Sequence, residues 1–216
     1  MNTDLVTYYN KRAKEYEAIY QKPERQEDLK TLATLLRDHF AGKNILEIAC
    51  GTGYWTNVIA KTAASVFATD ISEAVLEIAK SKNYGAARVS FGMEDFDNYR
   101  PTKRFESLLG GFIWSHIHLQ DLKKFLENVN RCVLPGGSVV LLDNNYVPGS
   151  NLPLSTINEH GNSFQTRKLS DGSTHLVCKN FPSEAFIMKQ IEGIATDIRF
   201  INLEYYWMLI YRPVQH

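Results

Sequence analysis

Several features are scarce or absent in this 216-residue sequence, and their absence argues against whole classes of protein. No run of roughly 18 apolar residues occurs, and the first sixteen residues are polar and charged, so neither a transmembrane helix nor a signal peptide is expected. The three cysteines are odd in number and far apart, which offers neither a disulfide framework nor the spacing of a metal site. We therefore expect a cytoplasmic, soluble protein without a bound metal.

An excess of charge of one sign is also missing. The sequence has 24 Lys and Arg residues against 24 Asp and Glu residues, so no overall field favours nucleic acid or an anionic membrane. A basic stripe and an internal repeat are absent as well, and the length suffices for one substantial core. We expect a single domain over residues 1–216 whose partner is a small molecule, and nothing in the sequence indicates an oligomeric state.

The strongest pattern lies between Lys43 and Asp70. An apolar run at 45–49 is broken by the glycines of the segment 51–53, helical spacing follows over 54–61, and a second apolar run ends at Asp70. This order predicts a strand, a turn, a helix and a second strand. In such a unit the bare backbone and the helix start approach a ligand, and the final carboxylate accepts ribose hydroxyls. The stretch predicts a nucleoside-binding site.

A third glycine is missing from this turn. A dinucleotide fingerprint would place glycine three residues after Gly53, but that position is Thr56. The pattern therefore speaks against a nicotinamide oxidoreductase.

The flanking residues point to another cofactor. Glu47 followed by Ala-Cys-Gly-Thr-Gly, with Asp-Ile-Ser at 70–72, resembles motif I and the ribose-binding acid of class I S-adenosylmethionine-dependent methyltransferases. The resemblance implies an α/β, Rossmann-like, doubly wound sheet of seven strands, mostly parallel with the last strand antiparallel, and helices on both faces. It also implies S-adenosylmethionine as cofactor and transfer of its methyl group to a small-molecule acceptor by in-line displacement.

The later part of the chain fits the same resemblance. A strand over 105–112 runs into glycines, a helix with a buried apolar stripe follows, and Pro135-Gly136-Gly137 predicts a turn before a fifth strand. Two apolar segments at the end, within 197–213, resemble the family's last two strands.

Cofactor-binding residues follow from the resemblance. Gly110 lies where the family's chain passes closest to the sulfonium, and Ile71 would face the adenine. Where the family commonly has a Gly-Asp pair after the third strand, this sequence has Gly92-Met93, which leaves open whether Glu94, Asp95 or the backbone contacts the adenine amino group. The resemblance implies the following cofactor-binding residues in these motifs and at the end of the third strand: Glu47, Ala49, Gly51, Gly53, Asp70, Ile71, Met93, Glu94, Asp95 and Gly110.

Residues 1–40 are expected to form a helical cap, with tyrosines largely four residues apart on one face. The segment resembles the N-terminal cap of many small-molecule methyltransferases. By that resemblance Tyr16 covers the cofactor and Arg12 binds its carboxylate through a charge-assisted hydrogen bond. The alternative is a surface helix whose aromatic side chains pack on the core.

Residues 146–182 are rich in Gly, Pro, Ser and Asn and contain an alternating pattern on both sides of a turn, which predicts a hairpin. An insertion after the fifth strand lies over the ligand-binding edge of such a sheet, so we expect a lid over the acceptor. Arg167, Lys168, His175 and Lys179 could meet an anionic acceptor there. A solvated hairpin face is the alternative.

The loop after the fourth strand supplies the candidates for chemistry. Trp114 and His116 could line the acceptor site, and His116 is the candidate general base if the acceptor must lose a proton. His118, near a helix start, favours a structural role. A second hypothesis is a non-catalytic module that binds S-adenosylmethionine or another nucleoside without turnover.

Overall fold

A computed structural model describes residues 3–96 and 98–214. Residues 1, 2, 97, 215 and 216, which the predicted domain 1–216 includes, lie outside the described residues. The α-helices are α1 (Thr3–Arg12), α2 (Gln26–Phe40), α3 (Tyr54–Ile59), α4 (Glu73–Lys80), α5 (Leu122–Arg131) and α6 (Glu184–Ile191), and the 3-10 helices are η1 (Ala13–Gln21), η2 (Pro23–Arg25), η3 (Trp114–His116) and η4 (Leu119–Asp121). The strands are β1 (Asn44–Ile48), β2 (Ser65–Asp70), β3 (Arg88–Met93), β4 (Phe105–Gly111), β5 (Val133–Asn144), β6 (Thr156–Ile157), β7 (Ser163–Lys168), β8 (Thr174–Cys178), β9 (Ala195–Asn202) and β10 (Tyr206–Pro213).

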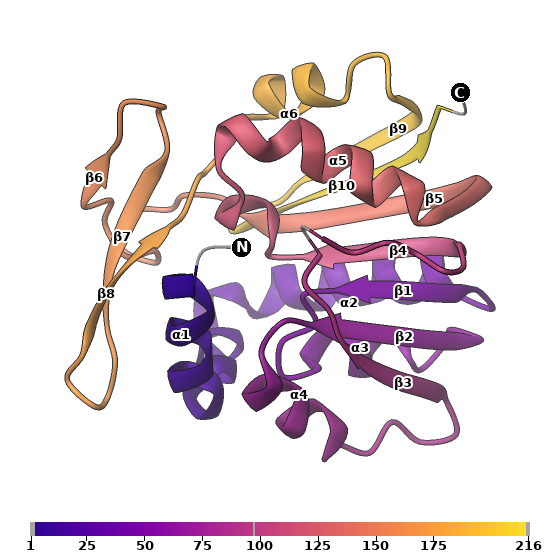
Figure 1. The fold of residues 1–216 in the computed structure, drawn as a ribbon, viewed down its shortest axis with the longest axis horizontal. Helices are drawn as coiled ribbons and strands as arrows, with labels where there is room; N and C mark the ends of the chain where they lie inside the picture. The colour runs from indigo at the N-terminus through magenta and orange to yellow at the C-terminus, as the bar shows by residue number, and fades with distance from the viewer. Residues whose placement is uncertain (1–2, 97, 215–216) are drawn as a thin grey trace.

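The central sheet has seven strands in the order β3-β2-β1-β4-β5-β10-β9 (Figure 1). β10 runs antiparallel to both of its neighbours, β5 and β9, while the pairs from β3 to β5 are parallel. This arrangement confirms the predicted doubly wound sheet. The strand order reverses between β1 and β4, and ligands of open α/β sheets bind outside the carboxyl ends of strands at such a point.

Apolar side chains fill both faces of the sheet. On one face α2, α3 and α4 pack through residues such as Leu36, Ile59 and Leu76, and on the other face α5 and α6 pack through residues such as Leu126 and Ile187. All five of these side chains are buried. Helices on both faces, as predicted, leave the ends of the parallel strands as the place for a site.

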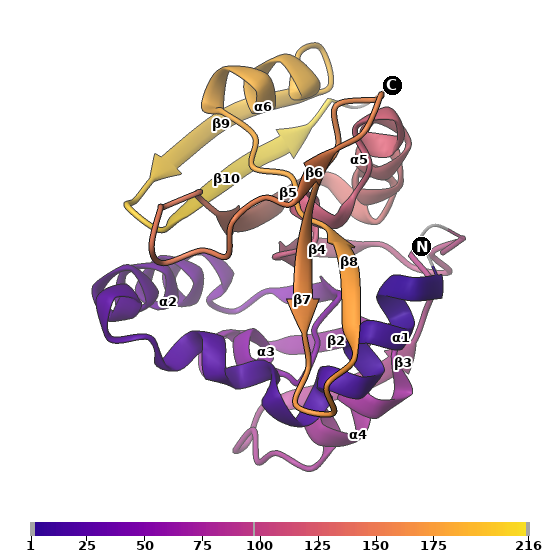
Figure 2. The same ribbon diagram turned by 90° about the vertical axis from the view of Figure 1, so that its left-hand side faces the viewer.

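The small sheet β6-β7-β8 stands over the carboxyl end of the large sheet, with α1 between the two (Figures 1 and 2). β7 and β8 pair antiparallel, from Phe164 opposite Cys178 to Lys168 opposite Thr174, and the turn between them contains Ser170 to Ser173. Tyr8 of α1 packs against Leu169 and Val177 of this hairpin. The hairpin and α1 are therefore joined by a small apolar cluster of their own.

Two elements differ in detail from the sequence predictions. The segment predicted as a turn, Pro135–Gly137, lies within β5, where the pairing with β4 shifts between Phe105 and Ser107. The extra residues of β5 form a bulge, so the chain turns locally at Pro135–Gly137 while the strand continues on both sides. Residues 13–21 of the predicted helical cap form a 3-10 helix.

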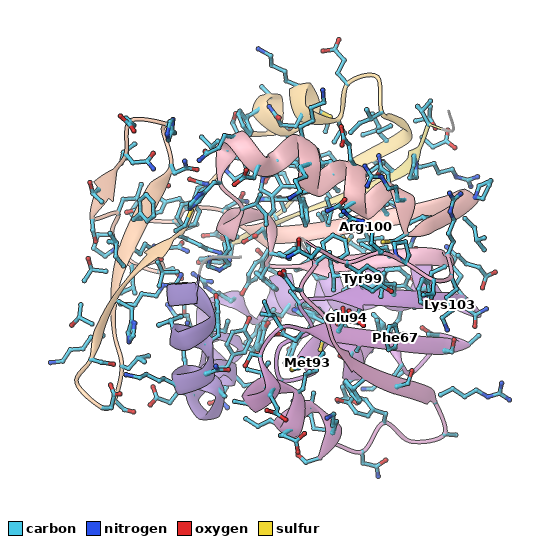
Figure 3. All side chains as sticks on the ribbon, viewed as in Figure 1. Phe67, Met93, Glu94, Tyr99, Arg100 and Lys103 are labelled. Carbon is cyan, nitrogen blue, oxygen red and sulfur yellow. The ribbon has the colours of Figure 1, made fainter. Side chains whose placement is uncertain are left out.

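Between β3 and β4 the described residues form no helix, and aromatic side chains cover that part of the sheet instead. The ring of Phe96 stacks on Tyr99, and the ammonium of Lys103 lies 5.1 Å from the ring centre of Phe105 and 5.9 Å from that of Phe67. Figure 3 shows Phe67, Tyr99 and Lys103 over this part of the sheet.

Candidate active site

A cavity opens at the carboxyl ends of β1, β2 and β4, where the strand order reverses. It encloses about 60 Å³ within a wider opening that is continuous with solvent. Seven of the residues predicted for the site line it, namely Tyr16, Ala49, Gly51, Asp70, Ile71, Glu94 and His116.

The turn after β1 has an unusual backbone. Ala49 has a φ of 52° and Gly51 a φ of 56°, both in the left-handed region. For alanine that conformation is uncommon, and such strain clusters at ligand-binding sites. A Cβ atom added to Gly51 would lie 3.4 Å from Cε1 of Tyr16, so any larger side chain at this position would extend toward the ring. The turn therefore presents bare backbone to the cavity beneath Tyr16.

Asp70 joins two loops at the cavity wall. Its carboxylate accepts hydrogen bonds from the backbone N–H of Gly51 and of Ser72, each at 2.9 Å. Burial raises the pKa of Asp70, while these N–H donors act in the opposite direction. A carboxylate has about four lone-pair directions, so two backbone donors leave acceptor capacity for ligand hydroxyls.

Glu47 does not line this cavity. It is buried in β1, where the hydroxyl of Thr56 donates to its Oε2 at 2.6 Å. Burial raises the pKa of Glu47 to about 8, an effect that the Thr56 hydrogen bond opposes and the charge of Asp70 reinforces. Thr56, which stands where a dinucleotide-binding turn would have glycine, is thus the partner of the motif carboxyl group.

The end of β3 places Met93 and the two acidic residues after it in different surroundings. Glu94 lines the cavity, and its backbone N–H donates to the carbonyl of Asp70 at 3.0 Å. Met93 is 66% exposed, and Asp95 accepts a hydrogen bond from Asn98 at 2.7 Å. Figure 3 labels Met93 and Glu94 at this end of β3. Among the three, Glu94 is the residue that reaches the cavity, where Phe96 also contributes a ring.

Two predicted glycines have packing roles. A Cβ at Gly110 would lie 2.8 Å from Cδ2 of Leu141 and 3.3 Å from Cγ2 of Ile113, so the space beside it belongs to the core. Gly111 lines the cavity instead. Gly53, with a φ of 80°, precedes α3, and a Cβ there would overlap the hydroxyl of Tyr84.

His116 is held in one tautomer. Its Nδ1 lies 2.6 Å from the carbonyl oxygen of Cys178, which only accepts, so Nδ1 carries the proton. Nε2 therefore accepts the hydrogen bond from the hydroxyl of Tyr9, at 2.7 Å. Burial and the nearby charges of Lys179 and Arg167 hold the pKa of His116 well below its usual value. The imidazole is neutral, and its lone pair points toward Tyr9 at the cavity wall.

A second cavity adjoins the first beneath the hairpin. The two share Tyr9, Tyr16, Phe112 and His116 among their lining residues. Arg12 and Arg167 line the second cavity only. The structure thus brings residues from α1, from η1 and from the loop after β4 to one boundary between two cavities, while hairpin residues line the second cavity alone.

Trp114 requires a correction. It was predicted to line the acceptor site, but its side chain is 1% exposed and packs edge to face against Trp207, with 5.7 Å between ring centres. It lines neither of the two cavities. The 3-10 helix η3 turns Trp114 into the core and His116 toward the site.

Comparisons with known proteins agree with this geometry. Residues 45–137 match the family model described as a methyltransferase domain. A solved structure titled "DhpI-SAH complex structure" is 25% identical, with a TM-score of 0.77 over 97% of this chain and 95% of that chain. Residues 45–137 thus belong to a methyltransferase domain, and the whole chain has the fold of the class I S-adenosylmethionine-dependent methyltransferases. A second structure, "DhpI-SAM-HEP complex", has a TM-score of 0.81 at 23% identity over 97% of this chain and 96% of that chain and supports the fold.

Curated methyltransferases match parts of the chain. Demethylmenaquinone methyltransferase of Tropheryma whipplei (strain Twist) is 29% identical over 103 residues, which are 48% of this chain and 42% of that protein. Malonyl-[acyl-carrier protein] O-methyltransferase 1 of Ilyobacter polytropus is 26% identical over 74% of this chain and 62% of its own length. The chain spans less than half the length of the first of these and about three fifths of the second.

The sequence did not single out several lining residues of this methyltransferase site. Phe112 has a φ of 60° and lines both cavities. A phenylalanine in the sequence does not predict this left-handed backbone conformation. Tyr9 lies next to Tyr8 in the tyrosine pattern of the cap, but its contact with His116 spans 107 positions. Ser72 entered the sequence analysis only as part of the Asp-Ile-Ser motif. It caps α4 and also hydrogen-bonds to Asn10 at 2.5 Å.

Searches of the described residues found neither a group of three or more His, Cys, Asp or Glu side chains placed to hold a metal ion nor a helix long and apolar enough to cross a membrane.

Proposed function

We propose that this protein transfers a methyl group from S-adenosylmethionine to a small-molecule acceptor by in-line displacement. The observation that carries the proposal is the junction of the two cavities. The first presents the features of a nucleoside site, with positive-φ backbone at Ala49 and the carboxylate of Asp70. The second meets it at Tyr9 and His116, so two ligands bound there would face each other across these side chains.

The residues of the first cavity suit S-adenosylmethionine in kind and place. Asp70 would bind the ribose hydroxyls, Ile71 and Phe96 would cover the adenine, and Glu94 would accept from its amino group. Tyr16, which lies over Gly51, would close the site. Burial raises the pKa of Tyr16, so the ring is neutral and its face can stabilise a cation.

When bound, the cofactor supplies a methyl group that is already activated by the sulfonium. The chain then has mainly to hold the acceptor in line with that group, and orientation of two reactants can contribute roughly 7 to 11 kcal/mol. The lid formed by α1 and the hairpin would exclude water from the junction.

His116 would act as general base for an acceptor that must lose a proton. Its neutral state and its Nδ1–H tautomer leave Nε2 as the free base, and the hydroxyl of Tyr9 occupies that position at 2.7 Å. An acceptor hydroxyl would either replace the Tyr9 contact or pass its proton through it. An acceptor that is already anionic would need no base.

Binding comes first in the test. Calorimetric titration of the full chain should show saturable binding of S-adenosylmethionine and of S-adenosylhomocysteine, with no binding of NADH. Binding of NADH in their place would contradict the proposal.

Turnover comes second. Isotopically labelled methyl transfer from S-adenosylmethionine would be followed with panels of small alcohols, carboxylates, phosphonates, amines and thiols. Transfer to one class identifies the acceptor atom. Cofactor binding without transfer to any panel would favour the alternative of a non-catalytic binding module.

A further inference from the structure

The second cavity has an unusual charge for a protein with no net charge. Among the residues whose side chains are described, six cations line it against one carboxylate, that of Glu15. The cationic residues are Arg12, Lys22, Arg25, Arg167, Lys168 and Lys179. They come from α1, the loop before α2, β7 and the end of β8, so folding alone gathers them around one space.

Partners within the protein account for part of this charge. Lys179 pairs with the buried Asp143 at 2.9 Å. Lys22 lies 3.9 Å from Glu24, and Arg25 donates to the hydroxyl of Ser150 at 2.9 Å. These three cations have structural contacts that explain their positions.

Arg12 and Arg167 form no ion pair with a carboxylate among the residues whose side chains the structure describes, 8–13, 15–96 and 98–214. Both instead flank the ring of Tyr8, with guanidinium carbons 5.7 Å and 5.6 Å from the ring centre. Both also donate to the Tyr8 hydroxyl, at 2.7 Å from Arg12 and 3.4 Å from Arg167. The neutral hydroxyl of Tyr8 is thus a hydrogen-bond acceptor shared by two positively charged guanidinium groups.

Arg167 is also left with an unused donor. Its Nη2 donates to Oε1 of Gln165 at 3.0 Å, but its Nε is buried and has no hydrogen-bond partner among the described residues. A buried donor without a partner is unfavourable, and a buried charge without a counter-ion more so. The planar fork of a guanidinium matches the two oxygens of a carboxylate, phosphate or phosphonate group.

We propose that the methyl acceptor carries an anionic oxyacid group, which binds between Arg12 and Arg167 over Tyr8. This inference rests on the proposed function, because it names the substrate class of the same site. The oxyacid group would offset the two unpaired guanidinium charges, and the atom to be methylated would lie toward Tyr9 and His116, where the two cavities meet. The assignment places Arg12 on the acceptor side, and not on the carboxylate of the cofactor.

The experiment uses the full chain saturated with S-adenosylhomocysteine and calorimetric titration with three probes at constant ionic strength in sodium chloride. The probes are inorganic phosphate, acetate and acetamide, the neutral analogue of acetate. Binding of phosphate or acetate without binding of acetamide supports the inference, and the tighter anion tells phosphoryl from carboxylate chemistry. If neither anion binds while S-adenosylhomocysteine does, this inference is overturned and the proposed function stands. If S-adenosylhomocysteine itself does not bind, the proposed function fails.

Variants test the assigned residues. Arg167→Gln should weaken binding of the better anion at least tenfold, and Arg167→Lys, which keeps the charge but loses the fork, should weaken it less. Lys11→Gln is the matched control, because it removes one positive charge next to Arg12 from an exposed pair with Asp171 at 3.5 Å. That control should bind the anion within twofold of the original chain.

The variant Arg12→Gln tests whether Arg12 binds the anionic group of the acceptor or the carboxylate of the cofactor. Tenfold weaker binding of the anion with unchanged affinity for S-adenosylhomocysteine supports the acceptor side. Weaker binding of S-adenosylhomocysteine with unchanged anion binding overturns the assignment of Arg12. Equal anion binding by Arg167→Gln and the original chain overturns the site altogether, provided that both melt at similar temperatures and bind S-adenosylhomocysteine alike.

Discussion

Single residues at this site have two kinds of partner, the protein and the proposed ligand. Asp70 is one example. Its carboxylate accepts hydrogen bonds from backbone N–H groups of two loops, each at 2.9 Å, and has further acceptor capacity for a ligand. The same carboxylate therefore shapes the turn and faces the cavity. His116 is similar, because the Cys178 carbonyl sets its tautomer and Tyr9 occupies its free nitrogen. Substitutions at such residues test function only beside a control for structure.

Replacement of Asp70 by alanine should weaken the binding of S-adenosylmethionine by about 1 to 3 kcal/mol, because ribose hydroxyls lose a charged acceptor. Isothermal titration calorimetry measures the change. Glu73→Ala, at an exposed position three residues further along, is the control and should bind normally. Unchanged affinity in Asp70→Ala would remove Asp70 from the cofactor site.

His116 should be neutral and protonated on Nδ1 at pH 6. Burial, the nearby cations and the Cys178 carbonyl together favour that state, since its pKa lies well below 6.5. Two-bond proton–nitrogen NMR spectra report the tautomer, and a His116→Gln sample assigns the signal. If His116 is the base, kcat/KM should be constant from pH 6.5 to 8 and fall only at lower pH. An imidazolium at pH 6 would contradict the predicted neutral state.

At the scale of elements, α1 links the two parts of the site. Its side chains contact the hairpin through Tyr8, His116 through Tyr9, and the start of α4 through Asn10. Tyr8, Tyr9 and Asn10 are consecutive, so one helical turn touches three separate segments. Docking of α1 and closure of the proposed site are therefore one structural event.

The two serine caps offer a matched test of this link. Ser72 caps α4 by accepting from Val75 N–H at 3.3 Å, and it also donates to Asn10 of α1. Ser183 caps α6 by accepting from Phe186 N–H at 3.2 Å, at an exposed position. Ser183→Ala should lower the free energy of unfolding by about 0.5 to 2 kcal/mol, the usual effect of a lost cap.

Ser72→Ala should cost a further 0.5 to 1.5 kcal/mol or so, because the hydrogen bond to α1 is lost as well. Urea unfolding of both variants gives the comparison. Equal losses in the two variants would show that the contact between Ser72 and Asn10 contributes nothing to the docking of α1.

At the scale of the whole molecule, the sheet's strand order places the site. Because the order reverses between β1 and β4, the helices after these strands leave in opposite directions and a crevice opens at their carboxyl ends. Two apolar layers fix the sheet on either side, so the crevice has rigid walls. Stability of the fold and integrity of the cavity should change together.

Glu47 links stability to pH. Its pKa is about 8 in the folded protein against a reference value of 4.5, so the folded state keeps a proton that the unfolded chain releases. Ionisation of the unfolded chain therefore lowers stability progressively as pH rises from 4.5 to 8, by up to about 1.4 kcal/mol per pH unit.

The isosteric change Glu47→Gln removes this ionisation and keeps an acceptor for the Thr56 hydroxyl. The variant should gain stability relative to the original chain as pH rises, with the largest gain near pH 8. Urea unfolding at pH 5, 6.5 and 8 measures the difference. A difference that does not grow with pH would show that Glu47 is ionised in the fold.

Much of the architecture was predictable because its causes are local in the chain. Alternation, helical spacing and the glycines after β1 indicated the strands, helices and nucleoside turn, and the motif from Glu47 to Asp70 indicated the family. The assignment among Glu94, Asp95 and the backbone was not decided locally, since it depends on which side chain the end of β3 turns toward the cavity.

The amino-acid sequence by itself determined the unit of strand, glycine turn, helix and strand, because periodicity and short motifs encode contacts between near neighbours in the chain. The seven-stranded sheet and the class of cofactor followed from the resemblance of this unit to a known family. Only the tertiary structure decided that Trp114 is core while His116 faces Tyr9, and that Leu141 fills the space beside Gly110. It alone also placed the guanidinium groups of Arg12 and Arg167 against the ring and the hydroxyl of Tyr8. The physical reason is that each of these contacts joins segments distant in the chain, and their proximity depends on how all the layers pack together.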